Sequence, residues 1–187
     1  MKIIENFVRP RIQDEIESLF LDSNFPYFYN NDMPVINAVL RDGAMVDENT
    51  LSIPQFVHTF VLDSKITSVL YSHLAPIVNK LLDSLEEDCY VYRCKVNMNL
   101  IDTRFDNKYQ TPHVDNGFDE QITAIYYAND SDGDTIFFDN SGKITERITP
   151  KKGKLILWKG KIFHAKCSPI NSINRTVINF NLLPHQK

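Results

Sequence analysis

Apolar residues recur at helical spacing in two stretches of the first half of the chain. The first stretch follows Pro10, which suits the first turn of a helix, and its apolar residues line one face up to about Asp22. Ser64 can cap a second helix, whose apolar face continues to Leu82. Because Pro76 falls inside this second stretch, we expect it to kink or divide the helix.

The other segments of the first half are less regular. Residues 3–8 form a short apolar run that predicts a strand. Residues 24–32 are rich in aromatic residues and asparagine, which favours a loop with an edge strand. We therefore expect residues 1–88 to form a helical and irregular cover over the rest of the protein.

Short apolar segments separated by turn residues dominate the second half of the chain. Turn residues gather at 129–133, 140–142 and 150–153. Eight strands are predicted, at residues 90–100, 111–115, 121–128, 135–139, 144–148, 154–158, 162–167 and 176–182. Such a succession predicts a mainly β protein, with a jelly roll or barrel at residues 89–183 and the helices packed outside one sheet. We expect residues 1–187 to form a single domain.

The composition is that of a soluble globular protein, with 43% hydrophobic and 24% charged residues. A net charge of -4 argues against a general affinity for nucleic acid or anionic membranes. Charged residues interrupt the first 15 positions, as a secretory signal would not allow, and no apolar run reaches the roughly 18 residues of a membrane span. The three cysteines, Cys89, Cys94 and Cys167, favour reduced thiols and a cytoplasmic location.

Two histidines and an aspartate are the strongest candidates for a metal site. His113 and Asp115 are two residues apart, so on a strand both side chains point to the same face. His164 follows several strands later, and a double-sheet barrel can return it to the first pair. Each residue alone is more often a packed or surface residue than a ligand, but their order and the arginine at 175 make coincidence a poor explanation.

The residue types favour iron over structural zinc. A structural zinc site needs four cysteine or histidine ligands, and the cysteines here have no CxxC spacing. Two histidines and one carboxylate suit Fe(II) with open positions for substrate and oxygen, although Mn(II) or a catalytic zinc fits the same ligands. Arg175 favours an oxygenase that uses 2-oxoglutarate, because a guanidinium can hold the distal carboxylate of an organic acid.

The second half resembles the 2-oxoglutarate and Fe(II)-dependent dioxygenases, specifically the prolyl 4-hydroxylase branch. The matching words are PHVDN (112–116), ITAIYYAND (122–130), GDTIFF (133–138), ITPKKGKLILW (148–158), FHAKCSP (163–169) and NRTVINF (174–180). HVDN followed by an IYY strand is similar to the oxygen-sensing prolyl hydroxylases of animals. The resemblance covers about residues 90–183, many strands rather than one motif.

This resemblance implies a double-stranded β-helix, cupin-like in architecture, that binds Fe(II) and 2-oxoglutarate. His113, Asp115 and His164 would bind the iron and form the catalytic centre. Arg175 would hold the 5-carboxylate of 2-oxoglutarate, and Tyr127 falls where this branch often places a tyrosine bonded to the same carboxylate. Tyr126 would point to the opposite face of the strand.

The chain departs from the branch before His113. The branch often has a tyrosine there that faces the cofactor, whereas this strand offers Asn97 or Asn99, with Tyr109 a further candidate. We predict that Asn99 is the cofactor contact. The segment 101–110 is also longer than usual, and such loops govern the choice of substrate rather than the chemistry.

The expected reaction is hydroxylation of an unactivated C–H bond, with dioxygen consumed, succinate and CO2 as co-products and ascorbate as the reductant. A prolyl residue in a peptide or protein is the leading substrate. The same chemistry on a free amino acid, small metabolite or nucleobase is the second possibility. A cupin-like module that binds metal without catalysis is the third.

Several other features have plainer interpretations. A group of lysines could attract an acidic partner or nucleic acid, but solvated turns are the more frequent explanation for Lys151, Lys152, Lys154, Lys159, Lys161 and Lys166. Asp130, Asp132 and Asp134 imitate a calcium loop, yet Ser141 stands where such a loop needs glutamate, so we expect a hairpin turn. Trp158 and Cys167 are expected in the core, and residues 27–33 and 41–45 are candidate substrate contacts.

Overall fold

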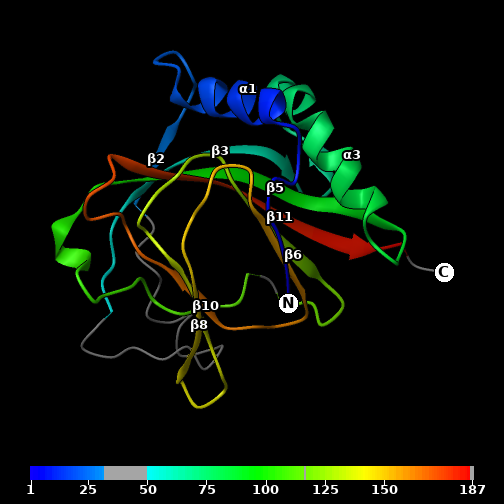
Figure 1. Cartoon of the computed structure of the whole chain (residues 1–187). Coiled ribbons are helices and arrows are strands. Elements are labelled where there is room, and N and C mark those ends of the chain that lie inside the picture. The colour runs from blue at the N-terminus through cyan, green and yellow to red at the C-terminus, as the bar shows by residue number, and fades with distance from the viewer. Residues whose placement is uncertain (32–49, 116, 186–187) are drawn as a thin grey trace.

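The protein folds into two antiparallel sheets that face each other, with two helices outside the larger sheet (Figure 1). The computed structural model describes residues 1–31, 50–115 and 117–185. The candidate substrate segment 41–45 lies outside these residues, as does part of 27–33. No helix in the described ranges is long and apolar enough to cross a membrane.

The first half of the chain contains both predicted helical stretches and more strands than expected. Its elements are β1 (Lys2–Ile4), α1 (Pro10–Leu21), β2 (Phe28–Asn30), β3 (Gln55–Leu62), β4 (Lys65–Ile66), the 3-10 helix η1 (Val69–Leu74) and α3 (Ala75–Asp83). The expectation of a merely helical and irregular cover was wrong at β3, because this strand pairs along β5 inside the large sheet.

The second half follows the predicted succession of strands closely. Its elements are β5 (Cys89–Leu100), the 3-10 turn η2 (Thr103–Phe105), β6 (Ile122–Tyr127), β7 (Thr135–Phe138), β8 (Ile144–Ile148), β9 (Leu155–Lys159), β10 (His164–Lys166) and β11 (Asn174–Pro184). The strand predicted at 111–115 does not form. Only His113 of that segment forms a bridge, to His164 at the start of β10.

Two further predictions need correction. Residues 3–8 contain a strand only at β1, after which Phe7 and Val8 turn into the core. Ser64 does not cap a helix, because it lies in the turn between β3 and β4 with a positive φ of 63°. The cap is Ser68, whose side chain accepts a hydrogen bond from the backbone N–H of Leu70.

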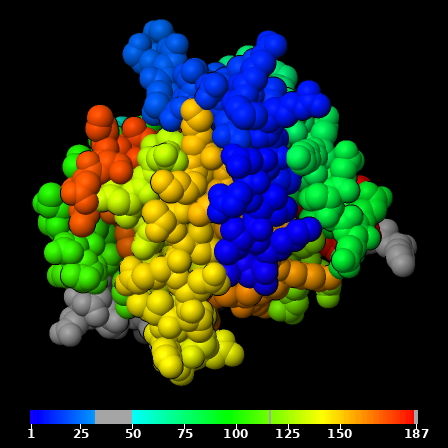
Figure 2. All heavy atoms as spheres, viewed as in Figure 1, coloured from blue at the N-terminus to red at the C-terminus, as the bar shows by residue number. Residues whose placement is uncertain are grey.

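The large sheet runs in the order β1-β9-β6-β11-β5-β3-β2, with β4 beside β3, and the small sheet runs β10-β7-β8. The first strand therefore lies at one edge, and Figure 2 shows this N-terminal segment at the surface beside the chain around β9. The prediction of an edge strand within residues 24–32 is confirmed by β2. Antiparallel pairing in two facing sheets confirms the predicted jelly-roll class.

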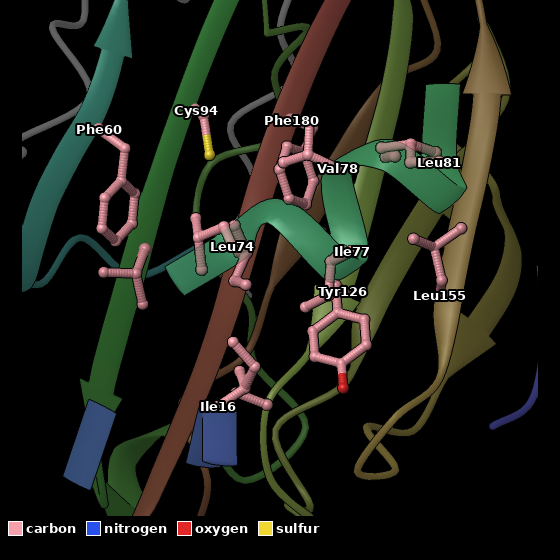
Figure 3. Close-up of a cluster of buried hydrophobic side chains, with 14 of the residues drawn as sticks. Ile16, Phe60, Leu74, Ile77, Val78, Leu81, Cys94, Tyr126, Leu155 and Phe180 are labelled. Carbon is pink, nitrogen blue, oxygen red and sulfur yellow. The ribbon is translucent and has the colours of Figure 1, made fainter. Parts of the chain in front are cut away.

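Side chains of the large sheet alternate between two buried layers. Ile16 of α1 and Ile77 and Leu81 of α3 pack with Tyr126 and Phe180 on the outer face of the large sheet (Figure 3). The inner layer lies between the sheets and consists of Ile125, Tyr127, Phe137, Ile148, Ile156, Trp158 and Val177. Tyr126 and Tyr127 thus face opposite sides of β6, as predicted.

Candidate metal centre

His113, Asp115 and His164 meet at one end of the space between the sheets. The Nε2 atoms of His113 and His164 lie 3.7 Å and 3.8 Å from the same Asp115 oxygen, Oδ1. The bridge between His113 and His164 brings the two imidazoles together, with ring centroids 4.7 Å apart. The three side chains that the sequence spreads over 52 positions therefore converge, and their ligand atoms lie within 4.8 Å of one another.

Backbone carbonyls fix the tautomer of both imidazoles. Nδ1 of His113 lies 3.1 Å from the carbonyl oxygen of Thr111, and Nδ1 of His164 lies 3.0 Å from that of Ile162. Because a carbonyl can only accept, each Nδ1 carries the proton and each Nε2 presents a lone pair. Two lone pairs thus face a carboxylate oxygen at distances too long for hydrogen bonds, and a cation between them would remove the repulsion.

Asp115 is held by two amides from the last strand. Asn179 and Asn181 of β11 donate from Nδ2 to its second oxygen, Oδ2, at 3.0 Å and 2.9 Å. Burial alone would raise the pKa of Asp115, but His113, His164 and Asn179 outweigh burial and hold that pKa well below its ordinary value. The carboxylate is therefore charged at neutral pH and presents Oδ1 to the histidines.

Burial lowers the pKa of His164 to about 4, although the charge of Asp115 opposes that shift. The imidazole is consequently neutral at pH 7 and able to bind a metal. The side chain of His113 is 47% exposed, whereas that of Asp115 is 7% exposed, so the cluster opens to solvent beside His113. Three donors with one open side suit a catalytic Fe(II) site, and a closed structural zinc site would need a fourth.

Arg175 lies at the start of β11 and is only 1% exposed. Its Nε donates to the carbonyl oxygen of Gly133 and its Nη2 donates to Oγ1 of Thr135, both at 2.7 Å. Its Nη1 is buried without a hydrogen-bond partner among the described residues. Since buried polar atoms nearly always have partners, a guanidinium with a spare donor indicates an anionic ligand.

Gly133 is required for this arrangement. A Cβ at that position would lie 2.7 Å from the carbonyl oxygen of Cys167 and 2.9 Å from Cδ of Arg175. Both distances are shorter than real Cβ atoms show, so a side chain here would displace Arg175 or the chain at Cys167. The glycine thus allows the backbone of residue 133 to lie against the arginine.

The hydroxyls of Tyr127 and Thr135 extend this donor group. Tyr127 donates to Oγ1 of Thr135 at 2.7 Å, and the same oxygen accepts from Arg175. Oγ1 of Thr135 therefore accepts both hydrogen bonds, and the hydroxyl proton of Thr135 itself is not used in either of them. Nη1 of Arg175 and this proton together can donate to a carboxylate.

Asn99 of β5 lies directly opposite Arg175 in the strand register. It is buried, and neither its Oδ1 nor its Nδ2 has a hydrogen-bond partner among the described residues. Asn97 is the next inward residue, opposite Val177. Tyr109 instead packs against Phe138 in a cluster on the outer face of the small sheet. Of the three sequence candidates, Asn99 therefore lies nearest to Arg175.

Sequence analysis missed Thr135, Gly133, Asn179 and Asn181. The asparagines did carry a signal, since Arg175, Asn179 and Asn181 fall on one face of a mostly buried strand. Polar residues on the inward face of a buried strand need partners, and this pattern could have identified them. Thr135 carried no comparable signal because threonine is common in strands.

The remaining sequence features adopt their plainer roles. Five of these lysines are paired with acids, as in Lys152 with Asp14 and Glu17. Lys166 donates a hydrogen bond to Oε1 of Gln55. Asp132 accepts hydrogen bonds from the backbone of residues 170–172 rather than forming a calcium loop. Trp158 and Cys167 are buried, as expected.

Known proteins share this fold, and part of the sequence matches a known family. The family model of the 2OG-Fe(II) oxygenase superfamily matches residues 99–183. No curated protein is detectably similar to the chain in sequence.

Three solved structures illustrate the likeness in fold. A Pseudomonas putida prolyl-4-hydroxylase is 13% identical with a TM-score of 0.56, over 98% of this chain and 92% of that one. A Trichoplax adhaerens prolyl hydroxylase, in complex with a hypoxia inducible factor peptide fragment, is 16% identical with a TM-score of 0.57, over 96% and 82%. SnoN, a non-heme alpha ketoglutarate dependent epimerase from nogalamycin biosynthesis, is 9% identical with a TM-score of 0.55, over 97% and 77%.

These structures share one fold but carry out different reactions, so the fold alone does not determine the substrate. The family match includes all three residues of the metal cluster as well as Arg175, Tyr127 and Asn99. The donor set in the structure fits the two cofactors of that family, Fe(II) at the cluster and 2-oxoglutarate beside Arg175. Over residues 99–183, the chain matches the 2OG-Fe(II) oxygenase superfamily.

Proposed function

We propose that this protein hydroxylates a prolyl residue in a peptide or protein. In this proposal His113, Asp115 and His164 bind Fe(II), while Arg175, Tyr127 and Asn99 contact 2-oxoglutarate. The observation that carries it is the pairing, inside one two-sheet space, of a cation-binding triad with a buried guanidinium that has an unused donor. The likeness to two prolyl hydroxylases supports proline as the target.

When bound, Fe(II) and 2-oxoglutarate supply oxygen activation, in which one oxygen atom of O2 enters the C–H bond and the other enters succinate as CO2 is released. The protein's residues position the reactants. Asn179 and Asn181 keep Asp115 oriented, and the carbonyls of residues 111 and 162 keep both Nε2 lone pairs free. Arg175 and the hydroxyl pair neutralise the distal carboxylate and fix its direction.

A cofactor assay tests the chemistry first. Purified protein with Fe(II), ascorbate and 2-oxoglutarate should form succinate, and His113→Ala or Asp115→Ala should abolish that formation. Arg11→Gln, on the exposed face of α1, serves as the matched purification control. Absence of succinate with every substrate offered would refute the enzyme proposal and favour a metal-binding module.

Mass spectrometry tests the substrate. Proline-containing peptides should gain 16 Da in an iron-dependent manner, and fragmentation should place the oxygen on proline. A gain of oxygen on a free amino acid, small metabolite or nucleobase instead would refute the prolyl proposal while preserving the chemistry. The similarity in fold to an epimerase makes this comparison necessary.

A cytoplasmic location is also proposed, because all three cysteines are free and buried. A fluorescent fusion that entered a secretory compartment would contradict it.

A further inference from the structure

The inner face of the large sheet continues past the metal cluster onto β5. Arg93 lies opposite Asn181 in the strand register, and Lys95 lies opposite Asn179. These are the two asparagines that hold Asp115. Residues directly opposite each other in an antiparallel pair share a face, with Cβ atoms about 5 Å apart. Two basic side chains therefore border the metal cluster.

The neighbours along β5 confirm which way these side chains point. Cys94 and Val96 alternate with them and are fully buried in the cluster beneath the helices. Successive side chains of a strand face opposite sides, so Arg93 and Lys95 face the side of the metal cluster.

Arg93 has no partner for its charge among the residues that the structure describes. It is partly buried, yet it forms no hydrogen bond or ion pair with any described residue. Arg104 and Arg147, by comparison, lie within ion-pair distance of Asp102 and Asp134. Removing part of a guanidinium from water is costly unless an anion compensates, so Arg93 indicates an anion that is supplied from outside the described residues.

The two asparagines provide a second, independent sign of a ligand. The carboxylate of Asp115 can only accept, so each asparagine must turn its NH2 group toward it. The carbonyl oxygens of Asn179 and Asn181 remain buried and without hydrogen-bond partners among the described residues. Such oxygens need donors, and the backbone N–H groups of a peptide can supply them.

We propose that this face binds an acidic peptide substrate, with a carboxylate of the peptide paired to Arg93. This inference rests on the proposed function and adds to it the charge of the substrate. An extended chain advances about 3.3–3.6 Å per residue, and Arg93 lies one strand spacing from Asn181. Because Asn181 also holds Asp115, we expect the acidic residue within about two positions of the hydroxylated residue.

The test uses peptides of nine residues with one central proline in an Ala/Gly/Ser background. Asp, Asn or Lys is placed in turn at each of the two positions on either side of the proline. Product formation is measured by the 16 Da gain, and binding by fluorescence anisotropy of labelled peptides on the anaerobic protein with Fe(II) and 2-oxoglutarate. We compare the wild type, Arg93→Gln and Arg93→Glu, with Arg11→Gln on the exposed face of α1 as the control.

At one or two of these positions, Asp should exceed Asn by about 10- to 100-fold in kcat/KM and in affinity, the range of a charge-assisted hydrogen bond. Arg93→Gln should abolish that ratio, and Arg93→Glu should reverse it in favour of Lys. Arg11→Gln should preserve it. If Arg93 were merely structural, its replacement would lower kcat/KM and affinity for all peptides alike. It would not change which charge on the peptide is preferred.

Equal use of Asp and Asn peptides, or an Asp preference that survives Arg93→Glu, overturns the inference. So does the failure of every acidic peptide to bind. Succinate formation from 2-oxoglutarate without peptide is measured alongside and tests the proposed function by itself. If it is absent while Arg93-dependent binding of Asp peptides persists, the enzyme proposal fails and the acidic-peptide site stands.

Discussion

Replacing Thr135 with valine should destabilise the protein by about 2–4.5 kcal/mol. The hydroxyl of Thr135 accepts two hydrogen bonds of 2.7 Å, one from Arg175 and one from Tyr127, and both donors are at most 1% exposed. Valine has nearly the same shape but accepts neither bond. Losing a bond to a charged group costs about 1.5–3 kcal/mol and losing a neutral bond about 0.5–1.5 kcal/mol. The sum is a large fraction of the roughly 5–15 kcal/mol that stabilises a typical domain.

Urea unfolding of the metal-free protein at pH 7.5 measures this effect, with Thr135→Ser as the matched control. Serine keeps the hydroxyl and loses one methyl group, at a cost of about 1 kcal/mol. Tyr127→Phe completes a double-mutant cycle, and its effect should be smaller in the valine background than in the wild type. If valine destabilises the protein no more than serine does, the two bonds have no energetic role and the account of the donor group is wrong.

The remaining predictions concern the cofactor, the metal and pH. Arg175→Ala should weaken 2-oxoglutarate binding by about 2–5 kcal/mol in isothermal titration, and unchanged affinity would exclude Arg175 as the carboxylate contact. Asn181→Ala should lower Fe(II) affinity about 10- to 100-fold, because Asp115 loses one of its two amide donors; equilibrium dialysis would show it, and no change would contradict that role. Burial lowers the pKa of His164 from 6.5 to about 4, so below pH 6.5 the unfolded chain binds a proton that the folded protein does not. The chelator-treated protein should therefore lose about 2 kcal/mol of stability between pH 7.5 and pH 5 in urea titrations, and His164→Gln should lose less.

Sequence patterns identified the strands whose apolar residues alternate or run together between clear turns. β8 was predicted with its observed bounds, and β5, β6 and β9 within one residue at each end. Pro76 was expected to kink or divide the second helix, and α3 does begin beside it, at Ala75. Local chemistry suffices in these places because a turn residue or proline limits the backbone whatever lies nearby.

The errors arose where distant partners decide the structure. β3 carries apolar residues on both faces because one face lies under α1 and the other continues the inner face of the sheet, so its sequence shows no alternation. Ile66 fits a helical pattern, yet it is exposed, since it pairs with Val61 as part of β4. Val69 is exposed at the start of the 3-10 helix η1. Tertiary contacts overrode local preference in both cases.

In the candidate site, too, some features follow from the sequence and others depend on distant contacts. The residue types and order of His113, Asp115, His164 and Arg175 were enough to predict a cluster, and the triad does converge. The segment around His113 is nevertheless no regular strand, and its position depends on a bridge to β10. The hydroxyl of Thr135 could not be assigned because its importance comes from two side chains on other strands.

Both ends of the site join the two sheets. Arg175 on β11 reaches Thr135 on β7, and the triad joins His164 on β10 to Asp115, which is anchored to β11. Binding of metal or 2-oxoglutarate therefore stabilises the packing of the two sheets against each other. A ligand present at 100 times its Kd adds about 2.7 kcal/mol to the free energy of unfolding. Depletion of iron or of the keto acid in a cell would thus lower the free energy of unfolding of the protein.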